Sequence, residues 1–357
     1  MTKDNLVSKP MIFESKFLNV VFFVCSLMVI GIHSYNITDT TMDTFAGYVE
    51  GFLCHGIFIG AVPVFFFFSG HLFFRNITTH HGVLKKIKSR TKSVLMPFLV
   101  WSLLYFLIFS LGSYTPFFSN DGVSFAPLDI LKGVVFYRYC FPLWYMYQLF
   151  VFVLITPIIN IISQRRYLSL GLLSLLAIFS IFLTASIDIE VFPNNERSLF
   201  QFNFFCYYFA GCLSVKFPNE ILKFKKLIER NRCLVAFVSF FFISIFAFLQ
   251  SSIFDERIPF FYNRFFVPFV FVSLLVFLWC IYDKIPYIKN ASTMVVYGVH
   301  SIIGTIFTNV FSGVLNLLPT ILSFVIMFIL VSIISFLFAY VLKRFFKPIH
   351  FILSGGR

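Results

Sequence analysis

The chain has 357 residues, of which 59% are hydrophobic and 12% are charged, and its mean hydropathy is +0.90. Soluble domains carry about 25% charged residues, so the composition excludes a soluble globular protein and predicts a polytopic membrane protein. The seven cysteines are scattered, mostly inside apolar runs, and no CxxC pair occurs. This pattern argues against a disulfide framework and against a zinc site, and we expect no bound metal or cofactor.

Ten apolar runs lie between charged or polar breaks. At about twenty residues, each is long enough to cross the roughly 30 Å hydrocarbon core of a bilayer. We therefore expect one all-α membrane domain over residues 1–357, with about ten transmembrane helices. The expected spans are 17–37, 50–74, 93–113, 143–163, 167–186, 199–216, 233–252, 260–282, 291–314 and 319–342.

The basic residues predict how these spans are oriented. If the spans alternate, most of the 28 Lys and Arg residues fall on the side that also holds both termini. The positive-inside rule makes that side cytoplasmic, so topology accounts for the net charge of +13 without nucleic-acid binding. On the same side, 217–232 has the pattern of a basic amphipathic helix on the anionic inner leaflet. The opposite side keeps Lys132, Arg138, Arg197, Arg257 and Arg264.

The first span, LNVVFFVCSLMVIGIHSYNI, carries His33 near its far end. Burying an ionisable side chain in a span is costly unless it has a partner or a wet cavity, so such a residue marks a functional site by default. An imidazole also exchanges protons near neutral pH. A His in the headgroup region, bonded to Ser34 or Asn36, would occupy the same position, and both interpretations stand at this point.

Other polar side chains within the spans are few. Gln148, Asn203 and His55 are best explained as structural, because single polar residues in membrane helices commonly bond a neighbouring helix. Arg138, in FYRYCF, and Arg264, in FFYNRFFVPF, are cations with aromatic neighbours on the sparsely basic side. Such a setting suits a sugar or a polyanionic glycan, and it suits an interfacial anchor equally well.

A basic run, KKIKSRTKSVLMPF, precedes the third span. Its charges are explained largely by orientation in the membrane, but Arg and Lys also clamp the phosphates of a nucleotide-bearing donor such as coenzyme A. Arg90 is the residue of interest because, apart from Lys92, it lies closest to the membrane entry. Dinucleotide, P-loop and zinc-protease motifs are missing. The scarcity of carboxylates in the spans argues against a proton- or sodium-coupled pump.

Five stretches carry a family pattern when taken in order. They are SLMVIGIHS, ending just after His33; VPVFFFFSGHLFF; the basic run leading into LMPFLVW; PLWYMYQLFVFVLITPII, which includes Trp144; and TMVVYGVHSIIG, with Tyr297 and His300. The ordered set resembles the bacterial acyltransferase-3 family, in particular its surface-polysaccharide and exopolysaccharide O-acetyltransferase branch. Tyr297 and His300 resemble the closing Tyr-x-x-His element of that family.

The resemblance implies transfer of acetyl from cytoplasmic acetyl-CoA to a hydroxyl of a surface glycan or its lipid-linked precursor, in the bacterial cytoplasmic (inner) membrane. It implies that His33 is catalytic, either as general base on the sugar hydroxyl or as a transient acyl carrier. The substrate- and donor-binding residues that we expect alongside it are Arg90, Arg138, Trp144, Arg264, Tyr297 and His300. The expected partners are acetyl-CoA, the glycan and membrane lipids, and no nucleic acid.

One position departs from the family pattern. The family usually has an Arg eleven residues before the catalytic His, and here that position is Phe22. Either Lys16 or Arg90 replaces the missing cation, or the donor is handled differently, or the chain uses another acyl group or is inactive.

Two other functions remain as alternatives. A glycosyltransferase that uses a lipid-linked sugar predicts acidic residues in a sizeable outer loop after the first span; Asp39, Asp43 and Glu50 lie there, but the loop is short. A glycan flippase or exporter predicts a cation-lined cavity, often with internal repeats, and would survive mutation of His33. We see no internal repeat in the sequence.

Overall fold

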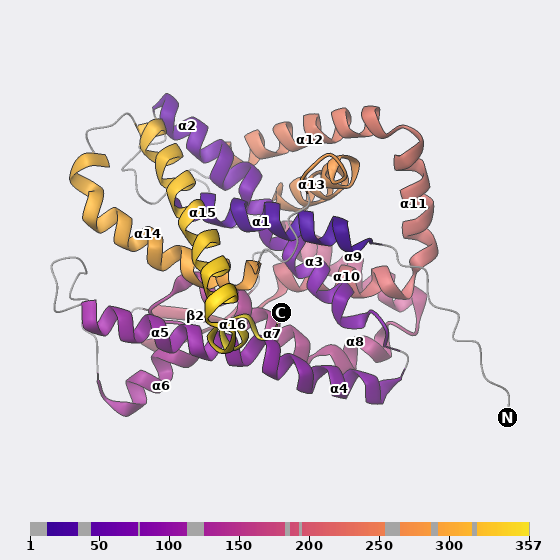
Figure 1. Cartoon of the computed structure of the whole chain (residues 1–357). Coiled ribbons are helices and arrows are strands. Elements are labelled where there is room, and N and C mark those ends of the chain that lie inside the picture. Colours follow the sequence, from indigo (N-terminus) through magenta and orange to yellow (C-terminus); the bar gives the residue numbers. More distant parts are fainter. Residues whose placement is uncertain are drawn as a thin grey trace.

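The computed structural model describes residues 13–34, 44–77, 79–112, 125–182, 186–192, 195–253, 265–286, 292–315 and 320–356. Helices make up most of this part of the chain (Figure 1). They are α1 (Ser15–Ser34), α2 (Phe45–Gly51), α3 (Ala61–Phe74), α4 (His80–Arg90), α5 (Met96–Gly112), α6 (Pro127–Val135), α7 (Trp144–Leu154), α8 (Thr156–Ile162), α9 (Arg166–Phe182), α10 (Phe202–Lys216), α11 (Pro218–Arg230), α12 (Arg232–Ile253), α13 (Val267–Ile281), α14 (Thr293–Leu315), α15 (Thr320–Phe345) and α16 (Lys347–Ser354).

Six stretches of helix in the described residues are long and apolar enough to cross a membrane. A seventh forms if the bent pair made of 141–154, which ends with α7, and α8 is counted as one span. Helices α9 and α13 are apolar but shorter. The chain is thus a helical, polytopic membrane protein, as its composition predicts. A helix overlaps each of the ten expected ranges, while the number of crossings and the side of each terminus stay predictions.

Several of the long helices are interrupted, and the interruptions have local causes. The second expected span comprises α2, a π-helical turn η2 (Phe52–Ile57), a 3₁₀ turn η3 (Phe58–Gly60) and α3. A second π-helical turn, η4 (Thr91–Leu95), separates α4 from α5, and the α7–α8 pair is bent by 53°, with Pro157 in the first turn of α8. Proline lacks the N–H that a continuous helix needs, and π-turns insert an extra residue that re-aims side chains.

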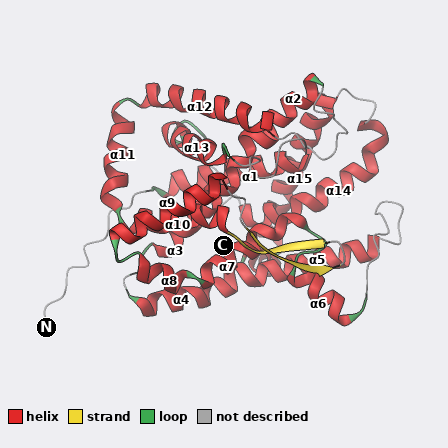
Figure 2. Cartoon of the chain, turned by 180° about the vertical axis from the view of Figure 1, so that it is seen from behind, coloured by secondary structure: helices red, strands yellow, loops and turns green. Residues whose placement is uncertain are grey.

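A two-stranded antiparallel hairpin departs from the purely helical expectation. Strands β1 (Ser186–Phe192) and β2 (Asn195–Gln201) lie between α9 and α10, where the expected spans 167–186 and 199–216 left only a short loop (Figure 2, yellow). The segment SIDIEVF alternates apolar and polar residues, which is the period of a half-buried strand. This alternation predicts a strand, whereas the length of the apolar runs on either side does not reveal it.

The buried apolar side chains form two clusters. One is centred on α1, α3, α10 and α13 and includes Phe17, Phe66 and Tyr208; the other lies around α5, α14 and α15 and includes Trp101 and Met327. Within the first, α3 and α10 touch backbone to backbone, because a Cβ on Gly70 or Gly211 would overlap the carbonyl oxygen facing it. Three half-buried aromatic side chains, Trp144, Tyr145 and Tyr297, pack against both clusters. They mark the seam at which the site lies.

Helix α11 runs across the bundle rather than along it. It links α10 to α12 and runs in a different direction from α12 (Figures 1 and 2). Phe224 and Leu227 are exposed on it, and Ile228 is buried beneath. The helix expected over 217–232 is confirmed by α11, and its position on a membrane surface stays a prediction.

Candidate active site

Two cavities meet at the seam between the clusters. The first, the Arg90 cavity, has a volume of about 430 Å³ and is lined by Arg90 together with side chains of α1, α3, α7 and α14. The second, the His33 cavity, has a volume of about 490 Å³ and is lined by His33 with side chains of η2, α7 and the hairpin. Phe65, Tyr145 and Tyr297 line both cavities. These three side chains are therefore the partition between them.

The Arg90 cavity combines one cation with an apolar wall. Arg90 is half-buried at the end of α4, just before the π-turn η4, and none of the described carboxylates forms a salt bridge with it. Its other polar lining comes mainly from hydroxyl-bearing residues, among them Ser69, Ser292 and Ser354. A guanidinium that no carboxylate neutralises is suited to an anionic group such as a phosphate.

Lys86, one turn before Arg90 on α4, has a different role. Lys86 donates to the carbonyl oxygens of Leu72, Phe73 and Arg75, at 3.1, 2.5 and 2.5 Å, and so satisfies the open carbonyls at the end of α3. Lys86 is therefore a helix cap, and Arg90 is the basic residue of this run that lines the cavity.

Phe22 and Lys16, the two positions raised by the departure from the family pattern, lie in different places. Phe22 lines the Arg90 cavity and stacks on Phe65, with ring centroids 5.9 Å apart and an interplanar angle of 10°. Lys16 instead donates to the carbonyl oxygen of Asp283, at 3.2 Å, and does not line the cavity. Of the two cations that could replace the missing Arg, Arg90 is the one in this cavity.

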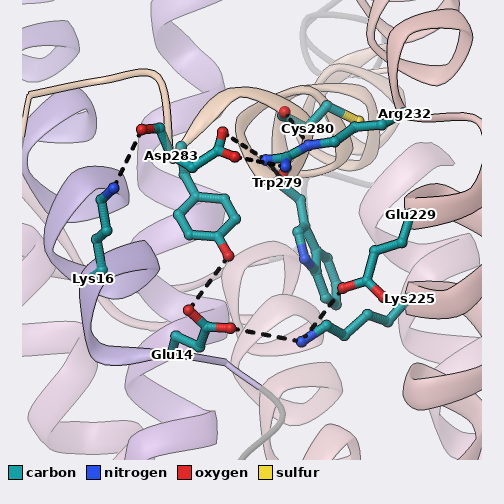
Figure 3. Close-up of polar contacts among 9 residues, drawn as sticks. Glu14, Lys16, Lys225, Glu229, Arg232, Trp279, Cys280 and Asp283 are labelled. Carbon is teal, nitrogen blue, oxygen red and sulfur yellow. Dashed lines mark hydrogen bonds and ion pairs between the residues drawn. The ribbon is translucent and has the colours of Figure 1, made fainter.

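Lys16 belongs to a polar network that joins the start of α1 to α11, α12 and the end of α13 (Figure 3). Arg232 donates to both carboxylate oxygens of Asp283, at 2.7 and 2.8 Å, and Lys225 pairs with Glu14 at 4.0 Å and with Glu229 at 3.6 Å. Exposed pairs of this kind contribute little individually, but together they link four helices at one end of the bundle.

His33 lies in the last turn of α1, with its ring centroid 5.1 Å from that of His300 on α14. His300 is buried, and its Nδ1 lies 2.7 Å from the carbonyl oxygen of Tyr297. Because a carbonyl only accepts, Nδ1 carries the proton and Nε2 has a free lone pair. Among the described residues, that Nε2 has no hydrogen-bond partner. The two imidazoles that sequence placed in separate spans are thus neighbours.

The headgroup interpretation of His33 depends on Ser34 or Asn36. The Ser34 hydroxyl donates to the carbonyl oxygen of Ile30, at 2.9 Å, within its own helix. Asn36 lies outside the described residues. His33 lines a cavity of mixed aromatic and polar character, and an ionisable residue in a span is tolerable where it faces a cavity of this kind.

The His33 cavity is lined by aromatic rings, a second imidazole and the polar side chains of the hairpin. Its lining residues include His55, Tyr137, Phe141, Trp144, Asp188, Arg197, Gln201, Asn203 and Phe204. Arg197 donates to the carbonyl oxygen of Phe136 at 3.3 Å and lies 5.5 Å from the centroid of the Tyr137 ring. Burial raises the pKa of the Tyr137 phenol to about 12, and the Arg197 guanidinium opposes this rise.

Gln148 anchors the hairpin to α7. Its Nε2 donates to the carbonyl oxygen of Ser198 at 2.7 Å, and its Oε1 accepts from the backbone N–H of Gln201 at 3.2 Å. These contacts agree with the structural role expected for Gln148. Asn203 and His55, which were expected to be structural too, line the His33 cavity.

The remaining predicted site residues differ in whether they line one of the two cavities. Trp144 lines the His33 cavity and packs against Phe204, with centroids 4.9 Å apart. The Tyr297 hydroxyl donates to the carbonyl oxygen of Pro142. Arg138 lines neither cavity; its guanidinium lies 5.8 Å from the centroid of the Tyr139 ring. Arg264 lies outside the described residues.

Sequence reasoning missed the hairpin residues, Ser69 as a partner of Tyr145, and Ser354 in the Arg90 cavity. The Ser69 and Tyr145 hydroxyl oxygens are 3.0 Å apart, so a hydrogen bond holds one member of the partition. In the described part of the chain, no group of three or more His, Cys, Asp or Glu side chains is placed to hold a metal ion.

Comparison with known proteins places this arrangement in a family. A family model described as an acyltransferase domain matches residues 16–340, a range that contains nearly all the residues lining the two cavities. No curated protein and no solved structure matches the chain. Because the family model covers most of its length, the chain belongs to the acyltransferase-3 family.

Proposed function

We propose that the protein is an O-acetyltransferase that moves an acetyl group from cytoplasmic acetyl-CoA to a hydroxyl of a surface glycan or its lipid-linked precursor. The observation that carries the proposal is the pair of cavities that share a partition, one containing Arg90 and the other His33. The proposal includes about ten transmembrane helices, both termini in the cytoplasm, and a bacterial inner membrane as the location.

The donor is assigned to the Arg90 cavity. Coenzyme A carries phosphates that a guanidinium binds well, and its uncharged acyl arm suits a wall that includes Phe22, Leu149 and Val153. The volume of about 430 Å³ is in the range of small-molecule sites. With Phe22 at the position of the family Arg, Arg90 supplies the positive charge.

The acceptor is assigned to the His33 cavity. Flat aromatic rings such as Trp144 cover the apolar C–H faces of a sugar, while Asp188, Gln201 and Asn203 offer hydrogen bonds to its hydroxyls. Asp188 and Arg197 give this cavity charges of both signs, in contrast to the single cation of the donor side.

His33 performs the chemistry from the acceptor side, in the cavity that shares a partition with the Arg90 cavity. As general base it takes the proton of the acceptor hydroxyl while that oxygen bonds to the carbonyl carbon of the thioester. The carbon–sulfur bond then breaks, the acetyl ester stays on the glycan, and the coenzyme A thiolate takes the proton back from His33. In the covalent variant the acetyl group rests on His33 between the two half-reactions.

His300 orients His33 in this scheme. Its Nδ1–H is committed to the Tyr297 carbonyl, so its Nε2 is available as an acceptor for an N–H of His33. That contact leaves the other nitrogen of His33 unprotonated and ready to act as base. The ring separation of 5.1 Å is compatible with one such hydrogen bond.

Neither a glycan exporter nor a glycosyltransferase is favoured by a feature of the described residues. The test is the O-acetyl content of the surface polysaccharide, measured by proton NMR in cells with the native chain and with His33→Ala at matched membrane expression. We expect acetyl signals with the native chain and none with the variant. Equal acetylation in both strains contradicts the proposal, and loss of the glycan itself from the surface without the protein favours the exporter.

A further inference from the structure

Helix α16 lies beyond residue 340, where the family match ends, yet it contributes Ser354 to the lining of the Arg90 cavity. It packs against α5, α14 and α15 (Figure 1). His350, Leu353 and Ser354 are buried in these contacts. A segment outside the matched domain is therefore part of the wall of the Arg90 cavity.

Two side-chain hydrogen bonds hold α16 in place from different helices. The indole Nε1–H of Trp101, on α5, donates to the carbonyl oxygen of Leu353 at 3.1 Å, and both residues are buried. On the other side, Nε2 of His350 lies 2.9 Å from the hydroxyl oxygen of Ser292, which precedes α14 and also lines the cavity. A buried donor left without its acceptor is costly, so both contacts favour one position of the helix.

After α16 the chain forms a tight turn at two glycines. Gly355 and Gly356 have φ angles of +66° and +77°, and their backbone N–H groups donate to the carbonyls of Ile352 and Phe351, at 3.3 and 2.8 Å. This left-handed turn caps α16 and presses Gly355 onto the backbone of Ser93. A Cβ on Gly355 would lie 2.5 Å from the Ser93 carbonyl oxygen and 2.7 Å from its Cα. Only glycine fits here, for its φ angle and for its size.

Ser93 is the middle residue of the π-turn η4, which begins directly after Arg90. The extra residue of a π-turn rotates the helix on either side of it. Whatever fixes η4 therefore fixes the direction in which the end of α4 presents Arg90 to the cavity.

We propose that α16 and the Gly355 turn are a positioning element that braces η4 and so holds Arg90 in place for the phosphates of the donor. The inference rests on the proposed function for its ligand. It adds that the donor site is completed by a segment that the family match does not cover, with Gly355 acting through Arg90.

The test compares Gly355→Ala with Gly171→Ala in the purified full-length protein. Gly171 is a matched control because a Cβ there meets no atom within 4 Å. The first readout is hydrogen exchange of the η4 amides, which needs no ligand: we expect faster exchange in Gly355→Ala and no change in Gly171→Ala. The second is coenzyme A affinity, which we expect to fall about tenfold in Gly355→Ala, the effect of misplacing one charged hydrogen-bond donor.

A double-mutant cycle shows whether the effect passes through Arg90. In an Arg90→Ala background, Gly355→Ala should cause no further loss of coenzyme A affinity, because the group that it positions is gone. If Gly355→Ala does not fold, Trp101→Phe, which removes the hydrogen bond to Leu353 together with part of the buried ring, serves in the same cycle with a smaller loss.

Unchanged exchange in η4, or losses that simply add in the cycle, overturns the inference. A native protein that binds no coenzyme A, with η4 exchange still responsive to Gly355→Ala, overturns instead the donor assignment of the proposed function while the brace itself stands.

Discussion

The two cavities differ in how they are built. The Arg90 cavity is walled by helices, including α16, and presents one cation that no described carboxylate pairs with. The His33 cavity takes much of its polar lining from a hairpin, and its charges are of both signs. A rigid helical wall with a single charge suits a ligand that is always the same, as coenzyme A is. A wall formed by a hairpin suits an acceptor whose structure varies, because loops and hairpins change without disturbing the core.

The largest effect that we predict is on His33. His33→Ala should lower acetyl transfer by about a hundredfold or more, the contribution of a positioned general base, while coenzyme A affinity stays near the native value. The measurement is transfer from isotopically labelled acetyl-CoA, with coenzyme A binding measured on the same preparation. A transfer rate within tenfold of the native rate would mean that His33 is not catalytic. It would also contradict the assignment of the chemistry to the His33 cavity.

Loss of Arg90 should affect the donor side alone. We expect Arg90→Ala to raise the KM for acetyl-CoA by roughly tenfold to a hundredfold, as removal of a hydrogen bond to a charged group does, and to leave the KM for the glycan unchanged. Lys88→Ala, an exposed change of the same charge on the same helix, is the control. Equal effects of the two variants would mean that Arg90 contributes only general positive charge.

The opposite pattern is expected on the hairpin. Asp188→Ala should raise the KM for the glycan by about fivefold, the value of one hydrogen bond, with no change in the KM for acetyl-CoA. Asp129→Ala, on α6 and outside both cavities, gives the baseline. A change in the KM for acetyl-CoA, with none for the glycan, would reverse our assignment of the two cavities.

The smallest effect concerns the partition. Ser69→Ala removes the hydrogen bond to Tyr145, and the loosened ring should raise hydrolysis of acetyl-CoA without acceptor about two- to fivefold. Ser244→Ala, whose hydroxyl bonds a carbonyl of its own helix, is the comparison. Hydrolysis that does not change would show that the hydrogen bond from Ser69 is not what holds Tyr145 in place.

The sequence predicted the helices better than it predicted their interruptions. A long apolar run is sufficient to predict a membrane helix, and a helix overlaps each expected range. The π-turns η2 and η4 have no such signature, because an inserted residue is accommodated by packing that the run does not reveal. The hairpin was missed because SIDIEVF is short and lies between two apolar runs, although its alternation is visible.

Some of the side chains that line the two cavities were named from the sequence, but which of them lie together was not predictable. His33, His300, Tyr297, Trp144 and Arg90 were all recognised in the sequence, but helix packing decides which of them meet. Arg138 shows that the pattern alone does not identify a site residue. As a cation among aromatic residues it suited a glycan site and an interfacial anchor equally well, and in the structure it lies near the Tyr139 ring and outside both cavities. Likewise, only the contacts distinguish Lys16, which is held by Asp283, from Arg90.

The central claim is that donor and acceptor enter from opposite faces and meet at His33. The direct test uses right-side-out membrane vesicles loaded with isotopically labelled acetyl-CoA, with de-acetylated surface polysaccharide supplied only outside. We predict that label appears on the outer polysaccharide with the native chain and is absent with His33→Ala. Label that reaches the polysaccharide only when acetyl-CoA is added on the same outer side would contradict the account.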